Sequence, residues 1–285
     1  MNHNMVWFKR RSMSVDGANN LNSPAFCVVL HDVAGPFRIQ IQHIVRQVFG
    51  LVGNRFACAL VPAWHGHCDD AALAELISIC GGCDEWLVHG MTHRRESDGH
   101  GGQSGTSRGT SRGFSPGYGG RLVSWLTNGA DEFGGLPLIQ IQERVTRSQF
   151  IIRDLTGRLP TGLVAPCWSL PVRSNELKGI DYVMGYNGLV PCCRSENDQP
   201  EATVRIASWS YDWGRFGKVA SLVNLFPEVR FRSLTDIVPC VVIHPADVGR
   251  GWLPVAIRKI QKLLDLGYRP VVPASLMSAR QASIL

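Results

Sequence analysis

The sequence predicts an α/β fold built on a parallel sheet or barrel. Over the first ninety residues, short apolar runs alternate with amphipathic segments in the order strand, helix, strand, helix, strand, which is typical of parallel βαβ units. The apolar runs are continuous rather than alternating, as expected for strands buried on both faces. Polar and aromatic residues follow these runs, at the edge where α/β barrels build their active sites.

The first part of this pattern contains three strands and two helices. Apolar runs predict strands at residues 25–30, 56–61 and 84–88. A helix over 39–49 is indicated by apolar residues at helical spacing, namely Ile41, Ile44, Val45 and Val48. A second helix runs to residue 79 and begins at Asp69 and Asp70, because acidic side chains are favoured in the first turn.

The rest of the chain continues with the same kinds of segment. Helices are expected at residues 138–155, 174–178, 217–225 and 253–266. Strands are expected at residues 161–165, 181–184, 202–207, 238–243 and 269–272, with a polar and aromatic turn at 209–213. A chain of 285 residues can bury the core of one barrel-sized domain, which we assign to residues 24–285.

Two segments lack the apolar residues that a core requires. Residues 1–23 contain basic residues without an apolar run after them, so we expect a poorly ordered leader rather than a secretory signal. Residues 94–120 are rich in Gly, Ser and Thr, and we expect a mobile loop over the mouth of the barrel. No apolar run reaches the ~18 residues that span a bilayer, so no transmembrane segment is predicted.

Cysteine content and net charge indicate the redox environment of the protein and whether it binds nucleic acid. The nine cysteines form no repeating framework, and some lie in apolar runs, such as Cys27, Cys58 and Cys240. A reduced, cytoplasmic setting is therefore expected. The C-G-G-C motif at 80–83 is interpreted as a helix end turning into a strand, with metal binding or redox cycling as the alternative. The net charge of +6 is modest, and no nucleic-acid partner is predicted.

Histidines, aspartates and tryptophans gather where the predicted strands end. These ends carry His31 with Asp32, Trp64 with His65, His89 with His93, Pro166 with Trp168, and His244 with Asp247. If the strands close into a barrel, Asp32, His89 and His93 form a site of two histidines and one carboxylate. Three protein ligands with an open position are the pattern of catalytic zinc, and they also suit other divalent ions.

Six short motifs follow one another over residues 25–275. They are L-H-D-V at 30–33, V-P-A-W-H-G at 61–66, L-V-H-G-M-T-H at 87–93, D-E-F-G-G-L at 131–136, G-L-V-A-P-C-W at 162–168 and V-I-H-P-A-D at 242–247. In this ordered series the sequence resembles the polysaccharide deacetylase superfamily, the NodB-like carbohydrate esterases, and within it the DUF2334 branch. The resemblance implies a distorted (β/α) barrel of seven strands. It also implies a bound divalent metal, usually zinc (Co²⁺, Ni²⁺ or Mn²⁺ also suit the site), and removal of acetyl groups from N-acetylated sugars.

The same resemblance implies roles for single residues. The family's metal-binding aspartate falls on Asp32, and its H-x-x-x-H pair falls on His89 and His93. The family's late-strand histidine, which acts as general acid, falls on His244. Asp247 is placed to orient that histidine, with a helix cap as the alternative.

The general base is where this sequence departs from the family. His31 occupies the position of the aspartate that acts as general base in the family. Imidazole can serve as a base near neutral pH, although a protonated imidazole at this position would repel the metal. Glu132, or Asp131 beside it, could instead reach in from its loop, so the base stays open. The arginine that often precedes the family's proline and aromatic pair is also missing before Pro166.

The predicted substrate-binding residues are Trp64, His65, Pro166 and Trp168. The two tryptophans are interpreted as apolar walls for a sugar ring or an acetyl methyl, with a place in the core as the alternative. The predicted function is a metal-dependent carbohydrate N-deacetylase. One alternative is a barrel that keeps its metal or sugar pocket without turnover, which the His31 departure motivates. The other is a metal amidohydrolase acting on a non-sugar amide, because the residues named belong to the reaction centre.

Overall fold

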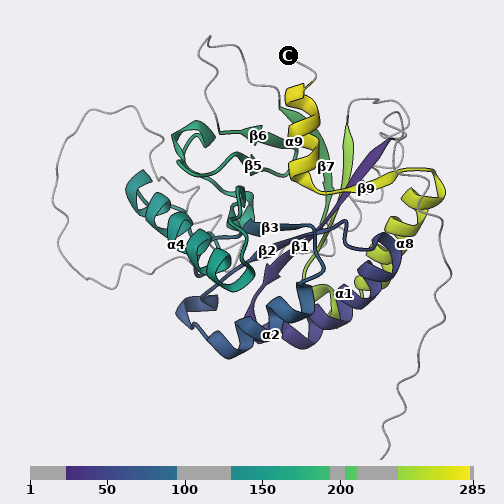
Figure 1. Cartoon of the computed structure of the whole chain (residues 1–285), viewed down its shortest axis with the longest axis horizontal. Helices are drawn as coiled ribbons and strands as arrows, with labels where there is room; N and C mark the ends of the chain where they lie inside the picture. The colour runs from purple at the N-terminus through teal and green to yellow at the C-terminus, as the bar shows by residue number, and fades with distance from the viewer. Residues whose placement is uncertain (1–23, 95–129, 193–202, 211–236, 283–285) are drawn as a thin grey trace, which may run out of the picture.

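The computed structural model describes residues 24–94, 130–192, 203–210 and 237–282 (Figure 1). The predicted leader 1–23, residues 95–120 of the predicted mobile loop, residues 211–213 of the predicted turn and the predicted helix 217–225 lie outside these ranges. Within them the predicted α/β barrel is confirmed, since the strands form a closed ring with helices around it. None of the described helices is both long and apolar enough to cross a membrane.

Eight strands make up the ring, in the order β2, β3, β4, β5, β6, β7, β8, β1 and back to β2. They are β1 (Ala25–Val33), β2 (Ala57–Leu60), β3 (Glu85–Val88), β4 (Gly162–Val164), β5 (Tyr182–Met184), β6 (Gly188–Pro191), β7 (Val204–Trp209) and β8 (Val238–Ile243). Seven of them are parallel to one another, and β6 is antiparallel to both of its neighbours. The ring therefore has one strand more than the seven expected. The sequence does not predict β6 because its four residues, G-L-V-P, are too few and too mixed to indicate a strand.

Strand β1 closes the ring because it is long enough to pair with three other strands. Its first residues pair with β9 (Arg269–Val271), its central residues with β8, and its last residues with β2. The predicted strand ends at Leu30, whereas β1 continues to Val33. His31 and Asp32 therefore lie inside the sheet rather than after it.

The helices cover the outside of the ring and one of its ends (Figure 1). They are α1 (Arg38–Val52), α2 (Asp70–Cys80), α4 (Leu138–Thr156), α7 (Ala246–Gly249), α8 (Leu253–Asp265) and α9 (Pro273–Ala282). The predicted apolar stripe of α1 is buried. Asp69 caps α2, because its Oδ1 accepts a hydrogen bond from the N–H of Ala72 at 3.0 Å. The predicted helix at 174–178 is a single 3-10 turn, Ser174–Glu176.

Helix α9, which the sequence pattern does not predict, closes the end of the ring where the strands begin. It contacts β6 and β7. The N–H of Ala274 in its first turn donates to Oε2 of Glu85 at 3.1 Å, and the hydroxyl of Tyr182 donates to Oε1 of the same carboxylate. Glu85 and Tyr182 are the first residues of β3 and β5. The opposite end of the ring is therefore the one available for a site.

Alternation along the strands separates two cores. One set of apolar side chains packs between the ring and the outer helices. The other fills the ring, and its members nearest the strand ends include Val29, Leu87 and Val242. Because successive side chains of a strand point to opposite faces, the next interior positions belong to His31, His89 and His244. Packing inside the barrel thus directs three histidines to the same end.

Candidate metal centre

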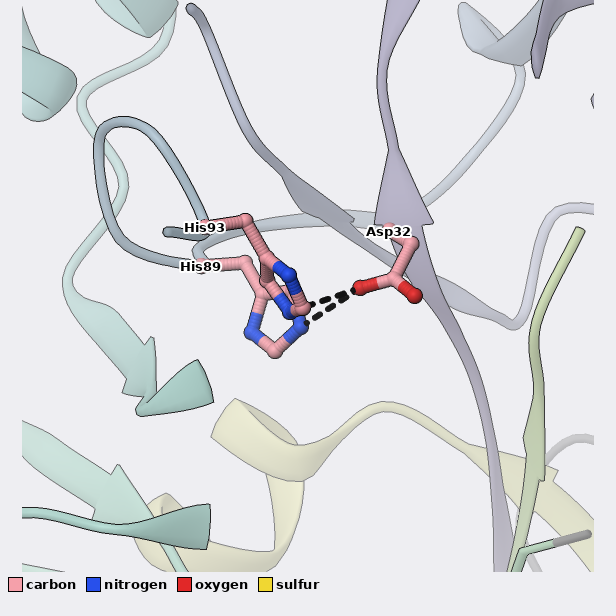
Figure 2. A group of neighbouring side chains, drawn as sticks. All are labelled: Asp32, His89 and His93. Atoms are coloured by element: carbon pink, nitrogen blue, oxygen red, sulfur yellow. Dashed lines mark hydrogen bonds and ion pairs between the residues drawn. The ribbon is translucent and has the colours of Figure 1, made fainter. Parts of the chain in front are cut away.

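Asp32, His89 and His93 meet at the end of the ring where the strands end (Figure 2). Oδ1 of Asp32 lies 3.1 Å from Nε2 of His89 and 3.0 Å from Nε2 of His93. One ligand atom from each residue lies within 4.8 Å of the others, and no second group of this kind occurs among the described residues. The two histidines are buried, whereas the Asp32 side chain is 13% exposed. The three predicted ligands are thus brought together at a site that is partly exposed at Asp32.

A bulge in β1 lets two consecutive side chains reach this site. Leu30 pairs with Cys58 and Val33 pairs with Leu60, so that His31 and Asp32 together lie opposite one residue of β2. The backbone of Asp32 has a φ of 53°, in the left-handed region that bulges use. In a regular strand, one of these two side chains would point away from the interior.

A hydrogen bond at Nδ1 of His89 determines which ring nitrogen faces the site with a free lone pair. Nδ1 of His89 lies 2.8 Å from the carbonyl oxygen of Val164, and because a carbonyl only accepts, Nδ1 carries the proton. Burial lowers the pKa of His89, so the ring is neutral and Nε2 presents a lone pair. Burial alone would raise the pKa of Asp32, but the charge of His93 and the hydrogen bond from His93 hold it well below its usual range. Asp32 is therefore ionised.

These donors fit a divalent cation. The lone pair of neutral His89 and an oxygen of ionised Asp32 face each other at 3.1 Å with no proton to share, and a cation between them removes this conflict. Two ligand atoms that each lie about 2.1 Å from the same metal are about 3.0–3.4 Å apart, which is close to the distances between these donor atoms. An N–H to carbonyl bond behind the liganding nitrogen, as at Val164, is also typical of metal-bound histidine.

His93 reaches the site through a tight turn after β3. Gly90 begins the turn with a φ of +74°, and a Cβ there would lie 2.3 Å from Oε2 of Glu132, so only glycine fits. His93 itself has a φ of 52°. Its ring stacks on Trp64, with centroids 4.9 Å apart and planes 15° apart. The second predicted histidine ligand is therefore held in a strained conformation by its neighbours.

Glu132 binds the backbone of this turn. Its Oε2 accepts hydrogen bonds from the N–H groups of Met91, Thr92 and His93 at 2.9, 2.9 and 2.7 Å. Nη1 of Arg144 lies 3.2 Å from its Oε1, and the carboxylate is fully buried. Because both oxygens are committed to the turn and to Arg144, this arrangement argues against the predicted role of Glu132 as general base.

His31 lies at the centre of an aromatic cluster. Its ring centroid is 4.8 Å from those of His89 and Trp168, and 5.1 Å from that of His244. Burial, together with the neighbouring His89 and His244, lowers its pKa well below the usual value, so the ring is neutral and does not repel a metal. Its buried Nε2 has no hydrogen-bond partner within the described part of the chain. The third candidate base, Asp131, is buried in the turn before α4.

His244 and Asp247 are linked in two ways. Oδ2 of Asp247 accepts a hydrogen bond from the backbone N–H of His244 at 2.8 Å, and the same oxygen lies 3.9 Å from Nδ1 of the His244 ring. Both side chains are buried. The shorter contact fixes the chain where β8 turns into α7, and the longer one places a carboxylate beside the imidazole. Asp247 lies inside α7, whose N-cap is Pro245, so it is not the helix cap, and its role in orienting His244 stays a prediction.

The predicted substrate-binding residues fall into two groups. Trp64 stacks on His93 and also on His65, at 4.7 Å and 20°, so it supports a predicted ligand; His65 is exposed. Trp168 is half-buried beside His31 and meets Tyr186 edge-on at 5.8 Å, and Pro166 is buried. Trp168 is therefore the predicted aromatic wall that borders the histidine cluster.

Backbone strain is concentrated around this site. Five described residues other than glycine have positive φ values, namely Asp32, His65, His93, Cys167 and Trp168. All of them lie in the segments that the sequence places at strand ends. Such conformations cost of order 1–3 kcal/mol each and cluster at functional sites, where the surrounding structure holds them.

Three residues of the site region are not singled out by the sequence. Arg144 and Ser148 come from α4, and Tyr186 follows β5. Ser148 does carry a signal, because it lies on the buried stripe of α4 with Ile141, Val145 and Ile152, where a polar side chain needs a partner. Its hydroxyl donates to the carbonyl of Gly90 at 2.8 Å.

No family model and no curated protein matches this sequence. Solved structures do match. The peptidoglycan deacetylase PdaC from Bacillus subtilis is 14% identical, with 92% of this chain and 94% of that chain covered and a TM-score of 0.50. A protein of Mycobacterium smegmatis assigned to the polysaccharide deacetylases is 14% identical, with 93% of each chain covered and a TM-score of 0.55. The expected NodB-like barrel fold is therefore confirmed, and the DUF2334 branch stays a prediction.

Proposed function

We propose that this protein is a metal-dependent hydrolase that removes acetyl groups from N-acetylated sugars. The observation that carries the proposal is the meeting of ionised Asp32 with the lone pair of neutral His89, completed by His93, in a barrel with the fold of polysaccharide deacetylases. Two imidazoles and one carboxylate suit Zn²⁺, and Co²⁺, Ni²⁺ or Mn²⁺ can take the same donors.

The reaction needs a nucleophile, a base and an acid. Asp32, His89 and His93 would hold a divalent cation, which would supply a water nucleophile near neutral pH and polarise the amide carbonyl. Neutral His31, with its unpartnered Nε2, takes the proton of the attacking water. His244, 5.1 Å from His31 between ring centroids, gives a proton to the departing nitrogen. The water oxygen forms a bond to the carbonyl carbon, the C–N bond breaks, and acetate and the sugar with its free amino group are released.

Substrate contacts are proposed for the aromatic residues that border this cluster, Trp168 and Tyr186. The half-buried ring of Trp168, backed edge-on by Tyr186, offers an apolar face beside His31. Such a face suits an acetyl methyl group or the apolar side of a sugar ring. Pro166 and the exposed His65 are proposed as further contacts.

One observation favours a second function, a metal- or sugar-binding barrel without turnover. The pKa of His31 is held well below its usual value by burial first and by its histidine neighbours second, which weakens the ring as a base. A base of low proton affinity would leave the metal site intact while slowing the reaction.

Acetate release from N-acetylglucosamine oligomers tests the proposal. The metal-free protein is supplied with Zn²⁺, Co²⁺ or Ni²⁺, and His93→Ala serves as the control without a complete site. Metal-dependent release by the wild type alone supports the proposal. Metal binding without release supports the binding barrel, and release only from N-acetylated amino acids or similar non-sugar amides supports a different amidohydrolase.

A further inference from the structure

We infer that Glu132, supported by Arg144 and Ser148, positions the turn of residues 90–93 and thereby sets how tightly the site binds its metal. The inference rests on the metal site proposed above, but it does not depend on which reaction that site performs. It assigns Glu132 a role through His93 rather than one in contact with the substrate.

The N–H groups of the turn all point to one carboxylate. Met91, Thr92 and His93 donate to Oε2 of Glu132, and Met91 also lies within hydrogen-bond distance of Oε1. Successive N–H groups aimed at one point form a binding site for an anion. Arg144 compensates the buried negative charge at 3.2 Å. The carboxylate of Glu132 thus occupies the anion-binding site that the backbone of the turn forms.

The carbonyl groups of the turn are held as well. The hydroxyl of Ser148 donates to the carbonyl of Gly90 at 2.8 Å. The carbonyls of Met91 and Thr92 accept from the N–H groups of Ala63 at 2.9 Å and His65 at 2.7 Å, in the segment that follows β2. Hydrogen bonds to both its N–H and its carbonyl groups therefore restrain the backbone of the turn.

The strained backbone of His93 explains why the turn needs this support. Its φ of 52° is unfavourable for a residue with a Cβ, so the turn relaxes unless other contacts hold it. In Glu132→Gln the three N–H groups of the turn keep only a neutral amide oxygen, which accepts more weakly than a carboxylate, and Arg144 loses the charge that it pairs with. A metal would then have to restore the turn before it could bind, and apparent affinity falls by the fraction of molecules in the competent conformation.

The test is metal affinity rather than turnover. Co²⁺ is titrated into the metal-free wild type and Glu132→Gln, and binding is followed by calorimetry and by the visible absorption of bound Co²⁺. We expect Glu132→Gln to bind Co²⁺ about 10–100-fold more weakly and with an altered spectrum, as is typical when an outer partner of a ligand is removed. Glu85→Gln is the matched control, because Glu85 is a buried carboxylate at the other end of the barrel.

Each outcome decides a different point. If the wild type binds no Co²⁺, the proposed metal site fails. If the wild type binds and Glu132→Gln binds with the same affinity and spectrum, or Glu85→Gln weakens binding equally, the positioning role is overturned. If Glu132→Gln does not fold, Ser148→Ala removes only the hydroxyl that holds Gly90; a weaker affinity supports the inference, and an unchanged one overturns it.

Discussion

His31 and Asp32 are adjacent in the sequence, yet both reach the same histidine. Oδ1 of Asp32 lies 3.1 Å from Nε2 of His89, and the ring centroid of His31 lies 4.8 Å from that of His89. The bulge between Leu30 and Val33 makes this possible, because a regular strand would point the two side chains to opposite faces. One strand thus supplies a proposed metal ligand and the proposed base.

Asp32→Asn tests the ligand without removing the bulge. Asn tolerates positive φ as well as Asp does, so we expect the fold and the melting temperature to change little. Loss of the negative charge should weaken Zn²⁺ or Co²⁺ binding by more than the ~10–100-fold typical of an outer partner. Calorimetric titration of the metal-free variant measures this, and an affinity equal to the wild type would exclude Asp32 as a ligand.

His244→Gln separates an acid from a structural residue. A general acid contributes roughly 10²–10⁴-fold to rate, so turnover should fall by about that factor while metal content stays unchanged. The backbone N–H of His244 still donates to Asp247 in the variant, which preserves this link between β8 and α7. Metal content, melting temperature and acetate release are measured on one preparation. A lower melting temperature with unchanged turnover per folded molecule would leave His244 only a structural role.

The two tryptophans should respond differently to replacement by leucine. Trp64→Leu removes the ring that stacks on His93, and stacked aromatic pairs contribute about 0.5–1.5 kcal/mol, so metal affinity should fall roughly 2–10-fold. Trp168→Leu should leave metal affinity unchanged and raise KM for the sugar oligomer. Calorimetry and initial rates on both variants check the pair, and the reverse assignment of effects would contradict it.

Glu85→Gln should change how stability depends on pH. Burial, the largest influence, raises the pKa of Glu85, so the folded state binds a proton more readily than the unfolded state. The free energy of unfolding therefore declines as pH rises from about 4.3, the ordinary pKa of glutamate, through the raised folded value. Gln does not titrate, and its amide can bond both Tyr182 and Ala274, so this decline should disappear. Urea unfolding between pH 4 and 7 measures it, and an identical slope in the variant would refute the assignment.

Most of the barrel can be predicted from the sequence because its signals are local. Continuous apolar runs identify β1, β2, β3 and β8, and helical spacing identifies α1, α4 and α8 within a few residues of their ends. Strand β6 and helix α9 have weak local sequence patterns. Pairing with β5 stabilises β6, and contacts with β6 and β7 stabilise α9. Such elements leave little local pattern in the sequence.

The candidate ligands were also accessible to sequence reasoning, since His89 and His93 close an apolar run and Asp32 follows another. The support of those ligands was not. Glu132 holds His93 across 39 residues of chain, and it does so through backbone N–H groups that every residue except proline carries. Sequence by itself therefore determined the barrel and the three residues that meet in it. Tertiary structure decided the bulge that turns Asp32 inward and the carboxylate that positions His93, because both depend on contacts between distant segments that leave no pattern of residue types.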